Sequence, residues 1–167
     1  MIMLFSLLLL ALLLIVIIMT ISALLGVPFL PTNHRQAELM MELAEVGPGT
    51  TLVDLGSGAG RLLFLAAKRG AKAVGYELNP FLFFWTKCAI ALKGLGKRVD
   101  VKLQSLYEAD LSAATVVVAF LLNKPMQKLT EKLWHELPAG ATIVSYTFPI
   151  PDRTPVTKQQ GLFVYKV

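Results

Sequence analysis

The first 33 residues contain no Asp, Glu, Lys, Arg or His, so the charged side chains of the sequence all lie from residue 34 onward. Charged residues make up only 16% of the chain and hydrophobic residues 55%, which is more apolar than an average soluble domain. The net charge of +5 therefore belongs to the part that follows this segment. The sequence therefore divides into two segments of different composition, an uncharged segment and a domain of ordinary polarity.

The uncharged segment predicts one transmembrane anchor helix over residues 1–26. A helix rises about 1.5 Å per residue, so about 20 apolar residues cross about 30 Å of hydrocarbon. The run from Ile2 to Leu25 provides that length. A cleaved signal peptide is the alternative, but it would begin with basic residues and have an apolar core of about 7–15 residues. A buried helix of a soluble core is disfavoured because the segment has no polar face at any period.

The charge that flanks the two ends of the predicted anchor, together with the single cysteine, indicates on which side of the membrane the domain lies. His34, Arg35 and a basic domain follow the anchor, so the positive-inside rule predicts a single-pass protein with its domain on the cytoplasmic or organelle-matrix side of a lipid bilayer. The one cysteine, Cys88, cannot form an internal disulfide, which agrees with a reducing compartment. No Cys or His cluster accompanies His34 or His135, so no metal is expected. The sequence has no basic stripe with interleaved aromatic residues, so nucleic-acid binding is not expected.

Residues 27–167 predict one domain in which strands and helices alternate. Strand patterns cover 51–53, 72–77, 98–103, 114–122 and 141–148, and a hairpin is expected to close with 161–167. Helix patterns cover 35–46, 61–70, 81–96 and 125–137. This alternation predicts an α/β fold with a doubly wound, mostly parallel sheet, in which ligands bind at the carboxyl ends of the strands. Trp85 and the phenylalanines beside it are interpreted as packing of their helix.

A glycine loop, Asp54-Leu55-Gly56-Ser57-Gly58-Ala59-Gly60-Arg61, follows the first strand of the domain and opens a helix. The dinucleotide fingerprint G-x-G-x-x-G, counted from Gly56, needs a third glycine where Arg61 stands. The spacing G-x-G-x-G after an acid instead indicates S-adenosylmethionine, whose cationic amino-acid end favours the nearby carboxylate of Asp54. A tight turn that serves packing alone is the alternative.

The second strand ends in Glu77, about 20 residues past the glycines, where an acid can accept both ribose hydroxyls of a nucleoside. A solvated strand-end acid is the alternative, and its occurrence together with the glycine loop disfavours it. The loop and Glu77 together predict S-adenosylmethionine as the cofactor.

With these residues in place the domain resembles the seven-strand, Rossmann-like S-adenosylmethionine-dependent methyltransferases. It resembles more narrowly the small archaeal protein-lysine methyltransferases and the membrane-anchored mitochondrial protein-lysine methyltransferases of animals. The shared landmarks are VPFLPT (27–32), DLGSGAGR (54–61), VGYELNP (74–80), TVVVAFLL (115–122), ELPAG (136–140) and SYTFPIP (145–151). The resemblance implies a seven-strand sheet and transfer of methyl groups to lysine side chains of a protein, most simply a membrane protein.

The resemblance also implies site residues. Those that would bind the cofactor are Pro28, Pro31, Thr32, Asp54, Gly56, Ser57, Gly58, Gly60, Glu77, Asn79, Ser105, Leu106 and Phe120. Those that would act in methyl transfer are Thr32, Phe120, Asn123 and Tyr146. No general base stands out, so we expect positioning and desolvation to deliver a neutral lysine amine, whose ordinary pKa is about 10.4.

The chain departs from the resembled families at three positions. Ala59 stands where relatives often carry Asp, Ser105 replaces an Asn or Asp that meets the adenine, and Arg153 stands where Trp is expected. These departures leave open a non-catalytic, cofactor-binding membrane assembly factor. The predicted anchor would also suit a lipid or quinone methyltransferase.

Overall fold

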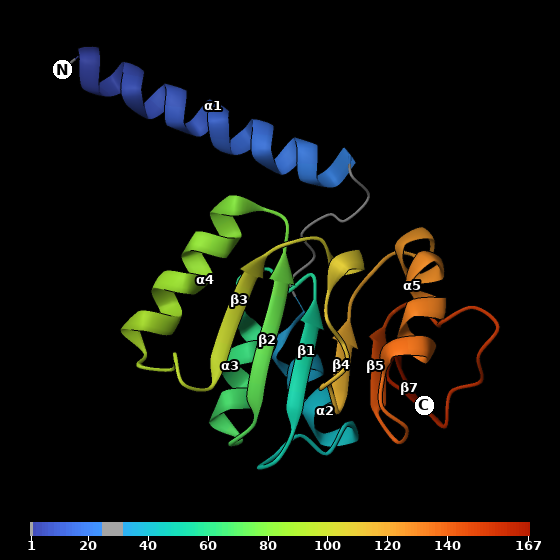
Figure 1. Ribbon diagram of the computed structural model, residues 1–167. Coiled ribbons are helices and arrows are strands. Elements are labelled where there is room, and N and C mark those ends of the chain that lie inside the picture. Colours follow the sequence, from blue (N-terminus) through green and yellow to red (C-terminus); the bar gives the residue numbers. More distant parts are fainter. Residues whose placement is uncertain (1, 25–31) are drawn as a thin grey trace.

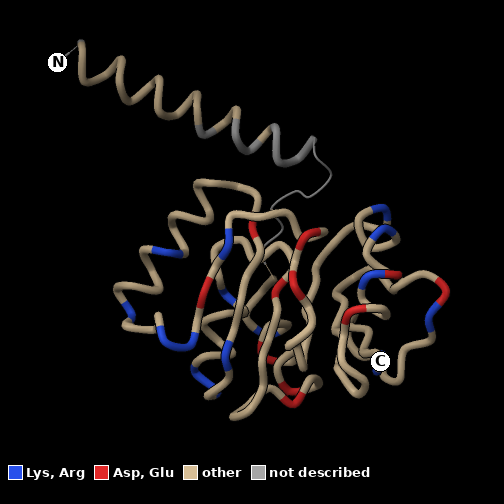
Figure 2. Tube along the Cα trace, viewed as in Figure 1, with Lys and Arg blue, Asp and Glu red and all other residues tan. Residues whose placement is uncertain are grey.

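The computed structural model describes residues 2–24 and 32–167. Its first helix, α1 (Ile2–Leu24), extends over 23 residues and runs above the edge of the sheet at which the parallel strands end (Figure 1). Figure 2 shows no charged residue along the described part of this helix, and the exposed side chains along it include Met3 at 78% and Leu10 at 63%. Within the described ranges, no helix has both the length and the apolar character to cross a membrane, so the predicted transmembrane helix is not supported.

The domain forms a seven-stranded sheet in the order β3-β2-β1-β4-β5-β7-β6 (Figure 1). The five strands β1 to β5 run parallel, and β7 pairs antiparallel with β5 and β6. The predicted mostly parallel, seven-strand Rossmann-like sheet is therefore confirmed. The strands are β1 (Thr51–Leu55), β2 (Lys72–Glu77), β3 (Val99–Leu103), β4 (Val116–Ala119), β5 (Thr142–Tyr146), β6 (Thr157–Gln159) and β7 (Leu162–Lys166).

Helices cover both faces of this sheet. They are α2 (His34–Leu43), α3 (Arg61–Lys68), α4 (Pro80–Leu92), the short 3-10 helix η1 (Leu106–Glu108) and α5 (Asn123–Glu136). Met40 of α2, Leu63 of α3 and Ile90 of α4 belong to one buried apolar cluster. Leu106 of η1 and Met126 of α5 belong to the other. The sheet thus has a separate core on each face, as a doubly wound fold requires.

Strand β4 is shorter than the apolar run over 114–122 predicts. It ends at Ala119, which pairs with Leu55, the last residue of β1. Because its neighbour ends there, Phe120 leaves the sheet at the carboxyl edge instead of continuing the strand. The buried Leu121 still packs in the core, which explains why the sequence reads as one strand.

Helix α4 packs differently from its sequence interpretation. Its buried residues are Leu82, Thr86 and Ile90, which recur every four residues and therefore share one face. Phe84 and Trp85 lie on the other side and are 62% and 60% exposed. The interpretation of these two aromatic side chains as internal helix packing is wrong, because the spacing of the inner face directs them to solvent.

Candidate active site

The glycine loop lies directly after β1, at the carboxyl edge of the sheet. The backbone N–H groups of Gly56 and Ser57 donate to the carbonyl of Tyr76 on β2, at 2.9 and 3.1 Å. Gly56, Gly58 and Gly60 have φ angles of 89°, 55° and 78°, a region that favours glycine. These three glycines are thus required by the backbone path that turns β1 into α3.

Glu77 holds this loop from the neighbouring strand. One carboxylate oxygen, Oε2, accepts a hydrogen bond of 2.8 Å from the N–H of Gly58, and the other, Oε1, accepts one of 2.8 Å from the N–H of Asn79. A carboxylate oxygen offers about two acceptor positions, so each keeps capacity for a ligand hydroxyl. Asn79 in turn caps α4, because its Oδ1 accepts from the N–H groups of Phe81 and Leu82. The tip of β2 therefore ties the glycine loop to the start of α4.

Asp54 lies beneath the loop and is 4% exposed. Burial, and then the nearby charge of Glu77, raise the pKa of its carboxyl from 3.8 to about 8. The group is therefore mostly protonated at neutral pH. A cation placed beside it would favour the ionised form and lower its pKa again. This environment suits a ligand that carries a positive charge.

The loop is packed so tightly that two glycines have no room for a side chain. A Cβ at Gly75 of β2 would lie 2.5 Å from Oγ of Ser57 and 2.7 Å from Leu63. A Cβ at Gly60 would lie 2.8 Å from Cγ2 of Thr86, whose hydroxyl donates to the carbonyl of Gly58 at 3.1 Å. Ser57 thus turns its hydroxyl toward β2. The packing of Gly75 and Thr86 was missed from the sequence, although a glycine inside a strand signals a close approach.

The segment that precedes α2 reaches the same loop. The guanidinium of Arg61 donates a hydrogen bond of 2.7 Å to the carbonyl of Thr32, which is 9% exposed. In the sequence, Arg61 served only as evidence against a dinucleotide-binding loop. Its contact with Thr32 was not predicted. The predicted cofactor residues Pro28 and Pro31 lie outside the described residues.

Ser105 and Leu106 lie beyond the end of β3. Leu103, the last residue of β3, pairs with Glu77, and Ser105 lies two residues after Leu103. Its Oγ caps η1 by accepting from the N–H of Tyr107 at 3.3 Å, and Leu106 is buried beneath it. The structure therefore brings this pair to the same edge as Glu77, with the hydroxyl of Ser105 already used as a helix cap.

The ends of β4 and β5 bring together two aromatic residues. The rings of Phe120 and Tyr146 lie 4.6 Å apart between centroids, at an interplanar angle of 51°. Beyond Tyr146 the chain turns sharply, with Thr147 at a φ of 69° and the hydroxyl of Ser145 donating to the carbonyl of Phe148 at 2.5 Å. Asn123 is exposed at the first residue of α5. Phe120 and Tyr146 thus form an aromatic pair at the carboxyl edge.

Comparison with known proteins decides the family. Residues 54–157 match the ANTKMT methyltransferase domain, and a protein-lysine N-methyltransferase of Saccharolobus islandicus is 36% identical over 131 residues, which cover 77% of this chain and 81% of that protein. The chain belongs to the ANTKMT methyltransferase domain family. The recognition of a seven-strand methyltransferase related to archaeal protein-lysine methyltransferases is therefore confirmed.

Two further comparisons place this ANTKMT-family chain among longer and among structurally known proteins. The adenine nucleotide translocase lysine N-methyltransferase of Mus musculus is 38% identical over 133 residues, 79% of this chain and 58% of that protein. The chain spans between 52% and 59% of the length of the mammalian lysine N-methyltransferases that it matches. An RNA methyltransferase from Salinibacter ruber, solved in complex with S-adenosyl-L-homocysteine, has a TM-score of 0.76 and 36% identity, and the match covers 81% of this chain and 91% of that one.

Proposed function

We propose that this chain is an S-adenosylmethionine-dependent protein-lysine N-methyltransferase that acts at a membrane. The observation that carries the proposal is the glycine loop fastened by Glu77, in a chain 36% identical to a protein-lysine N-methyltransferase of Saccharolobus islandicus. The inference that lysine is the methylated residue rests on the names of these relatives. The residues at the carboxyl edge of the sheet supply the cofactor fit.

The fit to S-adenosylmethionine rests on three groups of this chain. Glu77 has acceptor capacity left for ribose hydroxyls, and the buried Asp54 would ionise beside the ligand's amino group. Gly56, Gly58 and Gly60 let the backbone approach closely. Asn79, Ser105, Leu106 and the backbone of Ser57 complete the proposed cradle. When bound, the cofactor supplies a methyl group activated on a sulfonium.

The transfer end of the site is proposed at Phe120 and Tyr146. Aromatic faces attract cations, so the pair would hold the positive charge that develops on the amine as it accepts the methyl group. The rings also exclude water, which disfavours the protonated form of a lysine that enters between them. Thr32 and Asn123 are proposed as polar contacts of the amine. Positioning and desolvation then replace a dedicated base.

The membrane part of the proposal rests on α1. Apart from Ser6 and Thr20, its described side chains are apolar, and they are exposed without cover from the domain, Leu4 at 65% and Phe5 at 63%. Exposed apolar surface of this extent marks a site of interaction, and lipid is the partner that an uncharged helix fits. We infer that α1 holds the chain at a bilayer. The basic domain is then on the cytoplasmic or organelle-matrix side.

RNA methylation is a second candidate, because the structural neighbour from Salinibacter ruber is named an RNA methyltransferase. RNA-binding surfaces need clustered basic residues. The carboxyl edge of this sheet instead carries Glu77, Glu108 and Asp110, and α1 offers no positive charge. Methylation of a lipid or quinone, and cofactor binding without transfer, are the other two alternatives.

The test incubates the purified full chain with methyl-labelled cofactor and membranes stripped of their own methyltransferases. Label is then followed into protein, lipid extract and RNA, and protein is hydrolysed to identify methylated lysine. The matched control is Glu77→Ala, which should transfer far less label. Methyl-lysine in protein supports the proposal. Label confined to lipid or RNA, or bound cofactor without transfer, overturns it.

A further inference from the structure

The outward side of α4 is apolar where a helix of this fold should be polar. Phe81, Phe84 and Trp85 are 46%, 62% and 60% exposed, and the exposed Cys88 follows one turn later. A helix that covers a doubly wound sheet normally buries one face and turns charged residues outward. Along Pro80–Leu92 the only charged residue is Lys87. This surface therefore lacks the composition of a face that meets water.

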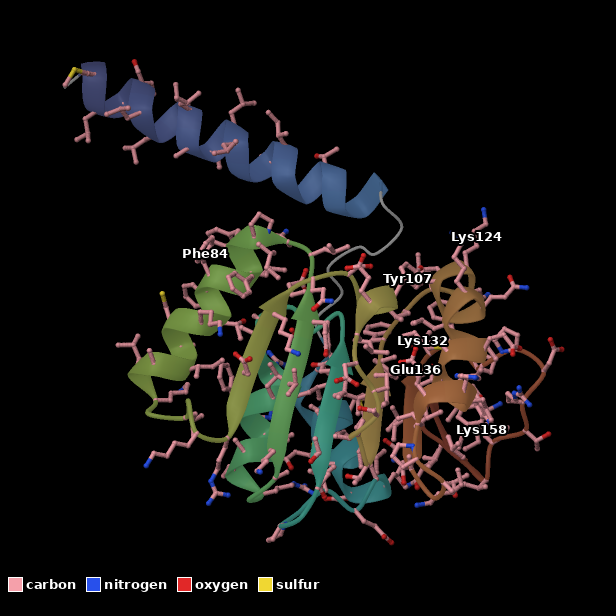
Figure 3. The ribbon with its side chains drawn as sticks, in the orientation of Figure 1. Phe84, Tyr107, Lys124, Lys132, Glu136 and Lys158 are labelled. Carbon is pink, nitrogen blue, oxygen red and sulfur yellow. The ribbon has the colours of Figure 1, made fainter. Side chains whose placement is uncertain are left out.

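Neighbouring strand ends extend the same surface. Leu78 after β2, Leu103 at the end of β3 and Tyr107 in η1 are 49%, 48% and 39% exposed. Figure 3 places Phe84 and Tyr107 on the side of the domain that faces α1. We name the six residues Leu78, Phe81, Phe84, Trp85, Leu103 and Tyr107 the carboxyl-edge patch. Its exposure means that α1 itself does not cover it.

The side chains of the patch favour the boundary of a bilayer over water. Trp and Tyr rings are amphipathic and are enriched where an apolar phase meets an aqueous one, and Phe and Leu on the same helix face enter the acyl boundary. Lys87, the one charged residue of α4, is paired with Asp100 at 2.6 Å, and Glu77 and Glu108 border the patch. The apolar and aromatic groups of the patch, and not its charge, therefore match a membrane surface.

The connection to α1 limits where the patch can be. Seven residues, 25–31, lie between the described parts of the chain. An extended chain advances at most about 3.3–3.6 Å per residue, so they span no more than about 25 Å. If α1 is held in lipid, the carboxyl edge must remain within that reach of it.

We propose that the carboxyl-edge patch docks on the lipid headgroup region of the bilayer that holds α1. The docked helix is bonded to the site, because Thr86, on the inner face of α4, donates to the carbonyl of Gly58. Docking through Trp85 and Phe84 therefore fixes the glycine loop and the mouth of the site next to the headgroups. The substrate lysine that this geometry serves lies at the membrane surface.

This inference rests on the proposed membrane association of α1, and one experiment separates the two. Cys88 is the only cysteine of the chain and is exposed beside the patch, so it can carry a small environment-sensitive fluorophore without mutation. The labelled full chain is bound to vesicles that contain phosphatidylglycerol and lipids with a quencher near the headgroup. The control carries the label at residue 47 (Cys88→Ser with Gly47→Cys). A Cβ at Gly47 meets nothing within 4 Å, and that residue precedes β1 at the opposite edge.

Docking predicts that the label at residue 88 is quenched by lipid and the label at residue 47 is not. Phe84→Ser with Trp85→Ser should abolish the quenching at residue 88 while the chain still floats with vesicles through α1. A chain that floats with residue 88 unquenched overturns docking and leaves the α1 proposal standing. A chain that does not float overturns both. Energy transfer between labels on two copies, without quenching by lipid, assigns the patch to self-association and also overturns docking.

Discussion

The carboxylate of Glu77 accepts a hydrogen bond of 2.8 Å from the backbone N–H of Gly58, 19 residues earlier in the chain. This bond joins the tip of β2 to the loop after β1. The side chain proposed to meet the cofactor ribose is therefore also the one that positions the glycine loop. Loss of Glu77 should affect both the ligand and the loop that receives it.

We expect Glu77→Ala to weaken S-adenosylmethionine binding by about 1–3 kcal/mol, the scale of a lost charge-assisted hydrogen bond. Isothermal calorimetry on the purified chain measures the change. Glu77→Gln is the matched control, because its single amide oxygen can keep one of the two backbone contacts and it should lose less. Unchanged affinity in a folded Glu77→Ala chain would remove Glu77 from the site.

The raised pKa of Asp54 predicts a stability that depends on pH. The carboxyl ionises at about 8 when folded, against an ordinary value of 3.8. Between these values the unfolded chain releases a proton that the folded chain keeps, so the contribution of this carboxyl to stability is fully present below about pH 4 and is lost as pH rises toward 8. For this one group the loss is on the order of a few kcal/mol. We expect the apo chain to melt at progressively lower temperature from pH 5 to pH 8.

Asp54→Asn supplies the comparison for this pH effect. The amide cannot ionise, so its melting temperature should vary much less over the same pH range, when both chains are measured in one detergent. The substitution leaves the rest of the sequence unchanged, so the difference between the two pH profiles reports Asp54 alone. Parallel pH profiles for wild type and Asp54→Asn would show that Asp54 does not keep its proton in the folded state.

The order of elements could be predicted from the sequence because each has a local signal. Asn33 and Asn79 both cap helices as their residue type suggests, and β2 covers the predicted 72–77. The end of β4 could not be predicted, because it depends on where its partner β1 stops and not on its own apolar run. Local patterns thus set the elements, and pairing sets their limits.

The candidate site was likewise predicted only in part from the sequence. Motif spacing identified the glycine loop and Glu77, and the structure brings them into contact. The bond from Arg61 to Thr32 and the packing of Thr86 on Gly60 join residues 29 and 26 positions apart, for which no periodicity exists to read. The exposed side of α4 was also missed, because an apolar residue in a helix pattern looks the same whether it faces a core or a membrane.

Gly60→Ala should destabilise the domain by about 1–3 kcal/mol, from its φ of 78° and from the Cβ that would meet Cγ2 of Thr86 at 2.8 Å. Chemical denaturation measures the effect. Gly47→Ala is the matched control, since a Cβ there meets nothing within 4 Å. Adding Thr86→Ser to Gly60→Ala removes Cγ2, keeps the hydroxyl and should restore part of the loss. No restoration would assign the whole effect to φ.

The aromatic pair should matter more for turnover than for cofactor affinity. Loss of one ring removes a cation–π contribution of about 0.5–2 kcal/mol, so Phe120→Ala should lower kcat about 2- to 30-fold. Phe120→Tyr keeps the ring beside Tyr146 and is expected to retain most activity. Cofactor affinity is measured in parallel by calorimetry. Equal losses of affinity and turnover would place Phe120 in the cofactor cradle and not at the transfer end.

The short connection between α1 and the domain should restrict the enzyme to substrates at the membrane. A flexible Gly/Ser insert of about 20 residues after Gly26 would add about 25 Å of reach on average and release the domain from the surface. Methylation of membrane proteins should then fall, because anchoring no longer raises their effective concentration, and methylation of soluble proteins should rise. Labelled membranes and soluble extract, separated by sedimentation, give the ratio for both chains. A ratio that the insert leaves unchanged would mean that α1 only determines location and does not select the substrate.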